Sequence, residues 1–122
     1  MTEFYYFGSE YTRYFDGLDA AWELACEQAA LCMKAGILVF SPIAHGHAIA
    51  KRGRMDMRDQ SMWLELNVPM MEAAKGLIYL KSYGWEESAG LRDEIAWFHG
   101  RARPVIPMRM GRAPIAEVLG AE

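Results

Sequence analysis

Short apolar runs alternate along the chain with longer segments in which apolar residues recur every three or four positions. The runs occupy residues 4–7, 37–40, 76–80 and 105–108, and each has the length and β-rich makeup of a strand. The first three are continuously apolar, which predicts burial on both faces and therefore a parallel sheet covered by helices. Pro104 and Pro107 favour a peripheral place for the fourth strand.

The periodic segments predict helices between the strands. The clearest runs from Asp16 to Ala35, where Asp16 or Asp19 can cap its start and Gly36 ends it. A second helix is expected from Asp56 to residue 73, with a proline as a possible kink. A third helix begins near Ser88, and a short fourth helix covers residues 113–119. Residues 41–54, which include a basic stretch at 51–54, are expected to be loop.

This alternation predicts a single α/β domain over residues 1–122, doubly wound with right-handed crossovers around a mainly parallel sheet of four to five strands. In such sheets ligands bind beyond the carboxyl ends of the strands. That rule brings Gly8 and Ser9, residues 41–47, and residues 83–94 to one edge. The sequence thus predicts a pocket there.

Residues 84–94 hold the most informative spacing. Ser88 is a good N-cap for the helix that follows, and Gly90 and Glu94 lie four residues apart on one helix face. Gly84 opens the loop before it. A ligand lying against Gly90 could reach the Glu94 carboxylate, which suggests a site for a polar or anionic small molecule. The alternative is an ordinary capped helix with a solvated Glu94.

The segment after the second strand carries Ser41, His45 and His47. His-x-His suggests a metal site, with Asp56 or Asp59 as further ligands, but no third histidine or thiolate has suitable spacing. The two histidines could equally shape a pocket. A metal-dependent hydrolase therefore remains an alternative, and no metal is assigned.

Composition narrows the class of protein. Lys plus Arg number 13 against 16 Asp plus Glu, a net charge of −3, which does not favour polymeric nucleic acid. No apolar run reaches the ~20 residues of a membrane span, and the N-terminus has no basic signal-peptide region. Cys26 and Cys32 are too far apart along one helix for a disulfide, so we expect reduced thiols and a cytoplasmic location.

Three segments resemble the nucleoside 2-deoxyribosyltransferase family. They are residues 5–9 (Tyr-Tyr-Phe-Gly-Ser), residues 40–43 (Phe-Ser-Pro-Ile) and the pattern Ser-x-Gly-x-x-x-Glu at 88–94. The chain is most similar to a small bacterial branch, the DUF1937 type, through Gly-Trp-x-x-Ser-x-Gly-x-x-x-Glu at 84–94 and Ser-Pro-x-x-His-x-His at 41–47. The resemblance extends to about Met108.

The resemblance implies a flavodoxin-like three-layer fold that cleaves N-glycosidic bonds of nucleosides or nucleotides, or transfers the deoxyribosyl group. Glu94 matches the nucleophile, which attacks C1′ of the sugar and forms a glycosyl ester. We expect the dipole of its helix to keep that carboxylate ionised. Tyr5 matches the tyrosine that orients the nucleophile or packs at the sugar, and Gly8 and Ser9 match the loop against the sugar or its 5′ substituent.

Two further positions qualify the expected activity. A serine at Ser88, where nucleoside-specific members have aspartate, favours a 5′-monophosphate, with Arg13, Arg54 or Arg92 adding positive charge. Asn67 stands where the family usually has an aspartate that manages the proton of the leaving base, and an amide cannot act as a general acid.

These features leave a non-catalytic nucleotide-binding protein, which senses or sequesters its ligand, as the main alternative to an enzyme. The resemblance also implies a homo-oligomer that acts on a small molecule without a cofactor.

Overall fold

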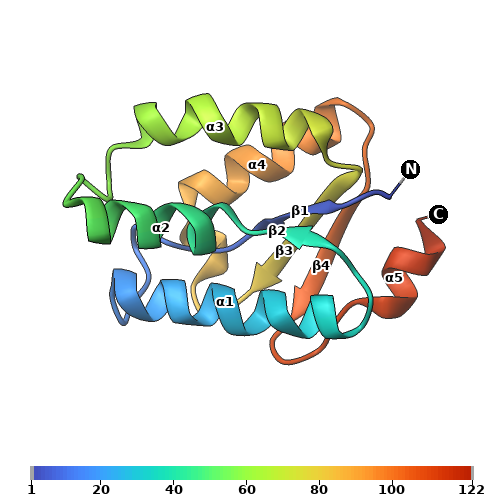
Figure 1. Ribbon diagram of the computed structural model, residues 1–122. Coiled ribbons are helices and arrows are strands. Elements are labelled where there is room, and N and C mark those ends of the chain that lie inside the picture. The colour runs from blue at the N-terminus through green and yellow to red at the C-terminus, as the bar shows by residue number, and fades with distance from the viewer. Residues whose placement is uncertain (1, 122) are drawn as a thin grey trace.

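Four parallel strands form one sheet in the computed structural model, which describes residues 2–121 apart from the side chain of Gln60. The strands are β1 (Tyr5–Gly8), β2 (Val39–Phe40), β3 (Gly76–Lys81) and β4 (Val105–Arg109). Their order is β2-β1-β3-β4, so the proline-containing β4 lies at an edge, as predicted (Figure 1). Helices cover both faces, which makes the protein an α/β three-layer sandwich of the flavodoxin-like kind.

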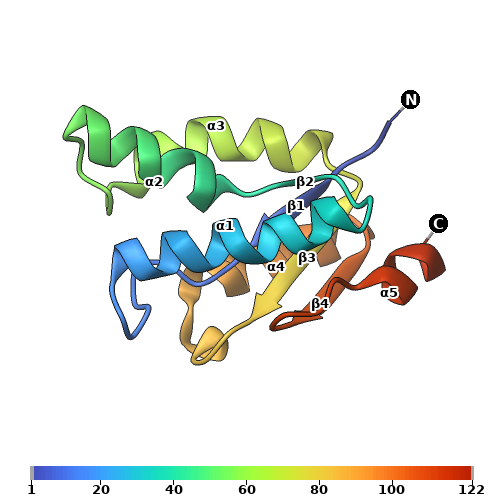
Figure 2. The same ribbon diagram turned by 60° about the horizontal axis from the view of Figure 1, so that its bottom comes forward.

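Within residues 2–121, five α-helices surround the sheet. They are α1 (Leu18–Lys34), α2 (Pro42–Gly53), α3 (Gln60–Ala73), α4 (Ala89–Gly100) and α5 (Ile115–Gly120). Figure 1 shows α3 and α4 above the sheet and α1 and α5 below it. Helix α2 lies alongside α1, beyond the carboxyl ends of the strands (Figure 2). Along residues 2–121, no helix combines the length and the apolar composition that crossing a membrane requires.

Alternate residues of β1 point into two separate cores. Tyr5 and Phe7 pack with Cys32 of α1 and Val118 of α5 in one core cluster. Tyr6 packs with residues of α3 and α4 in the other cluster. Because neighbouring strand residues face opposite ways, two adjacent tyrosines end in different layers of the molecule.

The predicted strands are confirmed, although β2 is reduced to two residues. The proposed caps of the first helix are wrong, since α1 begins after Gly17, whose φ of 95° suits only glycine, and no side chain caps it. Helix α3 starts later than predicted, because Asp59 caps it by accepting a hydrogen bond from Ser61 N. Pro69 lies inside α3 without ending it.

The prediction of a loop at residues 41–54 is wrong, because this segment forms α2. Ser41 Oγ accepts a hydrogen bond from Ala44 N at 3.0 Å, and Pro42 stands in the first turn, where its missing N–H costs nothing. Gly46 and Gly53 hide the helical pattern. Packing does not require a glycine at Gly46, since a Cβ there would make an ordinary contact with the Trp63 ring at 3.4 Å.

Candidate functional site

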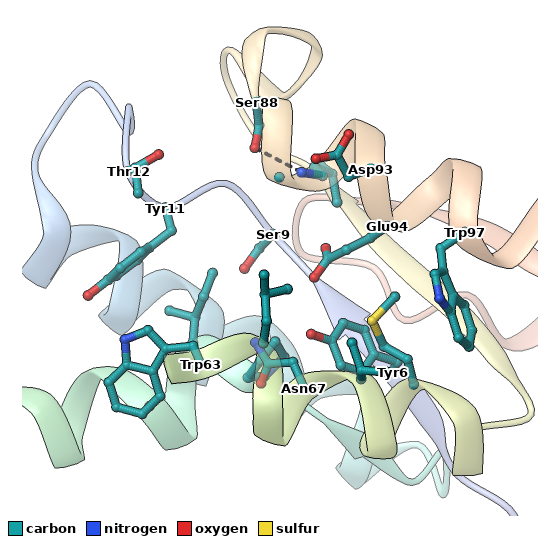
Figure 3. Close-up of a pocket in the computed structure, with 18 of the residues that line it drawn as sticks. Tyr6, Ser9, Tyr11, Thr12, Trp63, Asn67, Ser88, Asp93, Glu94 and Trp97 are labelled. Carbon is teal, nitrogen blue, oxygen red and sulfur yellow. Dashed lines mark hydrogen bonds between the residues drawn. The ribbon is translucent and has the colours of Figure 1, made fainter. Parts of the chain in front are cut away.

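A cavity of about 290 Å³ opens beyond the carboxyl end of β1. Its walls come from the β1–α1 loop, from α2 and α3, and from the first turns of α4 (Figure 3). Residues from all three segments that the sequence brings to one edge line it: Ser9, residues 42–46 in part, and Ser88 with Gly90 and Glu94. Of the α3 residues that line the cavity, only Asn67 is predicted from the sequence as a site residue.

Glu94 reaches the cavity by passing close over the end of β1. A Cβ added to Gly8 would lie 2.8 Å from Glu94 Oε1 and 2.8 Å from Leu91 Cδ1, so neither atom could stay where it is. Gly8 therefore contributes to the site by the absence of a side chain. It lets the backbone of β1 and the carboxylate of α4 approach each other.

The environment of Glu94 favours its neutral form. Although the residue as a whole is only partly buried, its carboxyl group is enclosed, and burial raises its pKa to about 7. Tyr6 counteracts this by lowering the pKa, and the charge of Asp93 raises it. The expectation that the helix dipole keeps Glu94 ionised is therefore wrong, because Glu94 lies in the second turn of α4, where the dipole is weak.

Tyr6, and not Tyr5, faces Glu94. Burial, and then the neighbouring Glu94, raise the pKa of Tyr6, so the phenol keeps its proton. Its buried hydroxyl has no partner of good hydrogen-bond geometry among residues 2–121, yet it lies close enough for each group to shift the pKa of the other. Tyr5 belongs to the core cluster on the opposite side of the sheet. The prediction that Tyr5 lies beside the nucleophile is therefore wrong, because Tyr6 occupies that place.

The start of α4 forms the polar corner of the cavity. Ser88 caps the helix by accepting a hydrogen bond from Leu91 N at 3.2 Å, as predicted (Figure 3). A Cβ added to Gly90 would meet open space, so the backbone there is accessible from the cavity. Ser9 lies opposite and is 8% exposed, and its hydroxyl has no hydrogen-bond partner within the described part of the chain.

Aromatic rings line the two ends of the cavity. Tyr11 and Trp63 lie at one end, and Trp97 lies at the other end, next to Glu94 and Tyr6 (Figure 3). The sequence places Trp63 and Trp97 at apolar helical positions, where a ring that lines a cavity cannot be told from one in the core. The amide of Asn67 lies along the α3 wall.

Like Tyr5, the predicted site residues Ser41, His45, His47 and Gly84 lie outside the cavity wall. Ser41 caps α2, and His45 is exposed on that helix. Gly84 turns the chain in a left-handed conformation beside Glu10. Gly8 also falls outside the lining, although it contacts the nucleophile candidate from behind.

His47 is 3% exposed, and both of its ring nitrogens have protein partners. Nδ1 lies 2.6 Å from Tyr11 Oη, and Nε2 lies 2.8 Å from Asp19 Oδ1. Trp22 stacks on the ring at a centroid distance of 5.3 Å. Within residues 2–121 no three His, Cys, Asp or Glu side chains group in a way that could hold a metal ion, so the His-x-His pattern gains no support as a metal site.

Residues 5–110 match a protein family described as a domain of unknown function, DUF1937. The match spans most of the chain and confirms the predicted resemblance to that branch. The link to nucleoside 2-deoxyribosyltransferases stays a prediction. A comparison with curated proteins gave no match.

Proposed function

We propose that this protein, which belongs to the DUF1937 family, binds a nucleoside or nucleoside 5′-monophosphate and cleaves its N-glycosidic bond with Glu94 as the nucleophile. The observation that carries the proposal is the Glu94 carboxyl group, enclosed over Gly8 in an aromatic-walled cavity. A planar base fits between aromatic rings, and a carboxylate beside the sugar suits the oxocarbenium-like character of this reaction.

The chemistry needs two successive bond exchanges at C1′. In the first, a Glu94 oxygen forms a bond to C1′ as the C1′–N bond breaks, and the electron pair of that bond leaves with the base, which takes up a proton from water. In the second, water or a second base attacks C1′ and gives up its proton to water, while the bond to Glu94 breaks and Glu94 leaves as a carboxylate. Tyr6 keeps its proton, so its hydroxyl can donate to the ionised Glu94 and stabilise the form that attacks.

The polar corner at the start of α4 supports binding of the sugar and its 5′ substituent. The first-turn amides of α4 have no carbonyl partner within the helix, and the unpartnered Ser9 hydroxyl lies opposite them. Arg13, Arg54 and Arg92 do not line the cavity, whereas Asp93 does. A 5′-phosphate would therefore depend on amides and hydroxyls, and both nucleosides and monophosphates belong in the test.

A non-catalytic binding protein is the second candidate. It is favoured by Asn67, which can hydrogen-bond a base but cannot protonate it, and by the raised pKa of Glu94, which leaves much of the group protonated near neutral pH. A protonated carboxyl is a weak nucleophile but a good hydrogen-bond donor. The two candidates thus share the site and differ in turnover.

The test is release of free base from a pool of nucleosides and 5′-monophosphates, followed by chromatography. Wild type should release base, and Glu94→Gln should release at least about 10³-fold less. Glu65→Gln, at an exposed position on α3, is the control and should match wild type. A sugar-sized adduct in intact mass spectra would establish the covalent step. Binding without release would support the second candidate, and neither binding nor release would reject both.

Self-association also remains a proposal. Exposed apolar side chains on α3, Met62, Leu64 and Leu66, are consistent with an interface. Sedimentation velocity of the purified protein would test it, and a single monomeric species at micromolar concentration would reject it.

A further inference from the structure

The lining of the cavity carries acidic side chains and no basic ones. Among the described residues that form it are two carboxyl groups, Asp93 and Glu94, and no lysine, arginine or histidine. Glu94 also has no cationic partner elsewhere in the described chain, where the ion pairs both involve Asp19. Taking a charge out of water is costly unless an opposite charge compensates it. A ligand that brings a positive charge would therefore complete this site.

Two arginines lie near the cavity but not in its lining. Burial raises the pKa of Tyr11 and Arg58 opposes this effect, which places Arg58 close to Tyr11. The guanidinium carbon of Arg101 lies 3.7 Å from the centroid of the Trp97 ring. Both arginines are exposed to solvent, which screens their charge. The enclosed Glu94 carboxyl group is screened much less, so the acidic side chains dominate inside the cavity.

The described residues of the lining include no good proton donor for a leaving base. Burial and then the negative charge of Asp93 raise the pKa of Glu94, so Asp93 is present as a carboxylate, which accepts but does not donate. Glu94 itself is the nucleophile, and the amide of Asn67 is not an acid. Burial raises the pKa of Tyr6, which holds its proton more tightly than an ordinary phenol does. A neutral base would have to take its proton from water.

A base that carries a fixed positive charge needs no proton to leave. In such a nucleoside the ring bonded to C1′ is a cation, as in a pyridinium or an N7-alkylated purine. A Glu94 oxygen forms a bond to C1′ while the C1′–N bond breaks, and the electron pair of that bond neutralises the ring, which leaves as a neutral base. Water then attacks C1′ and gives up a proton to the solvent, and Glu94 leaves as a carboxylate.

The aromatic wall formed by α3 suits the same ligand. Trp63 and Asn67 lie one helical turn apart on α3, and both line the cavity. A cation over the face of a tryptophan ring is attracted by the electrons of that ring. The cation–π contacts within the described chain involve Trp85 and Trp97, so the Trp63 ring remains available to a ligand.

We infer that the cavity selects N-glycosides whose base carries a fixed positive charge, with Asp93 and Glu94 as its counter-ions and Glu94 as the nucleophile. This rests on the proposed function, since it presumes cleavage at C1′, and it names the substrate class of that site. Pyridinium nucleosides and N7-alkylated purine nucleosides share this chemistry, and the turnover experiment distinguishes them.

Binding is tested with two analogues in which a CH2 group replaces the ring oxygen of the sugar, so that C1′ cannot form an oxocarbenium ion. One carries nicotinamide as a pyridinium cation. The other carries benzamide, in which a carbon atom replaces the charged nitrogen. Calorimetry with wild type at pH 8, where Glu94 is mostly ionised, should show the cation binding about 10-fold tighter than its neutral counterpart.

Two variants test whether the carboxylates cause this preference. Asp93→Asn should reduce it about 3-fold, and Glu94→Gln should reduce it at least as much, because each removes one negative charge from the lining. Both variants should bind the benzamide analogue within about 2-fold of wild type. Glu65→Gln is the matched control, since it removes an exposed carboxylate of α3 that lies outside the lining, and it should keep the full preference.

Turnover is measured with nicotinamide riboside, 7-methylguanosine, guanosine and adenosine, each also as its 5′-monophosphate, by chromatography of the released base. Because a cationic base leaves more easily even without an enzyme, each rate is divided by that of the uncatalysed reaction. The enhancement for at least one cationic nucleoside should exceed that for guanosine and adenosine by about 100-fold, the contribution that a general acid would have made for a neutral base. The nucleoside with the larger enhancement identifies the ring type.

Equal or tighter binding of the benzamide analogue would overturn this inference, as would a preference for the cation that is unchanged in both Asp93→Asn and Glu94→Gln. An equal or larger enhancement for guanosine or adenosine would also overturn it and would leave the proposed function intact. Tighter binding of the cation without cleavage of any nucleoside would reject the substrate assignment and favour a binding protein. If wild type neither binds nor cleaves any probe, the proposed function itself is rejected.

Discussion

The two ends of the cavity differ in whether their buried polar groups have hydrogen-bond partners within the protein. At one end His47 has a partner on each nitrogen and a ring stacked on its face. At the other end, Glu94, Tyr6 and Ser9 are buried with few partners. The hydroxyls of Tyr6 and Ser9 have no hydrogen-bond partner of good geometry within residues 2–121. Burial is the largest influence on the pKa of Glu94. Buried polar groups normally find partners within the protein.

Under the proposed function, the difference separates a structural arrangement from one that a ligand completes. The His47 end is complete without a ligand, because both ring nitrogens have protein partners. The Glu94 end is incomplete, and its polar groups face the same cavity. A buried polar group without a hydrogen-bond partner raises the free energy of the unliganded protein. Such a group therefore contributes the most binding free energy when a ligand supplies its partner. The predictions below test this contrast, starting with the largest expected effect.

The cost of enclosing Glu94 should appear in how stability depends on pH. Its pKa rises from the ordinary value of 4.5 to about 7, so the folded state binds this proton more tightly than the unfolded state. The stabilisation is full below about 4.5 and is lost as pH rises through about 7, a loss of about 3 kcal/mol. Urea unfolding between pH 4.5 and 8 should show this fall in wild type and not in Glu94→Gln.

Glu65→Gln, with an exposed side chain, is the control and should keep the wild-type dependence. Parallel curves for wild type and Glu94→Gln would mean that Glu94 is well solvated or well partnered. The contrast between the two ends would then disappear.

The approach of β1 to Glu94 gives the next prediction. Gly8→Ala places a Cβ 2.8 Å from Glu94 Oε1 and must displace the carboxylate, so base release should fall about 100-fold. Crowding against Leu91 should also cost about 1–3 kcal/mol of stability. Gly100→Ala is the matched control, because a Cβ there also meets open space and Gly100 lies on α4 outside the cavity lining.

Steady-state rates and urea unfolding of both variants provide the measurement. A Gly8→Ala protein with wild-type turnover would show that the close contact between Gly8 and Glu94 does not position the reacting group. An equal loss of activity in Gly100→Ala would mean that the effect of Gly8→Ala does not come from its contact with Glu94.

The sequence predicts the order of strands and helices well, because continuous apolar runs and helical periodicity are local signals. The four strands, the edge place of β4 and the Ser88 cap follow from them. The two glycines in α2 weaken that helix's local signal, and no close contact in the structure requires a glycine at either position.

The candidate site is less predictable, since it depends on which way side chains face. A run buried on both faces does not say whether Tyr5 or Tyr6 meets the ligand. Tyr11, His47 and Asp19 are joined across separations of 36 and 28 residues, and no local pattern connects them. Spacing and resemblance did identify Glu94, Gly90 and Asn67, all of which line the cavity.

The smallest expected effect comes from removing one hydroxyl at each end. Tyr11→Phe loses its hydrogen bond to His47 and leaves a buried nitrogen unpaired, so it should cost about 1 kcal/mol of stability. Tyr6→Phe removes a hydroxyl without a well-formed hydrogen bond and should change stability by less than about 0.5 kcal/mol at pH 5, where Glu94 is mostly protonated. At that pH the two variants therefore differ mainly through the partner that each hydroxyl has. Urea unfolding of both variants at pH 5 measures the difference. If Tyr6→Phe cost as much stability as Tyr11→Phe, the Tyr6 hydroxyl would already have a hydrogen-bond partner. The Glu94 end would then be as complete without a ligand as the His47 end.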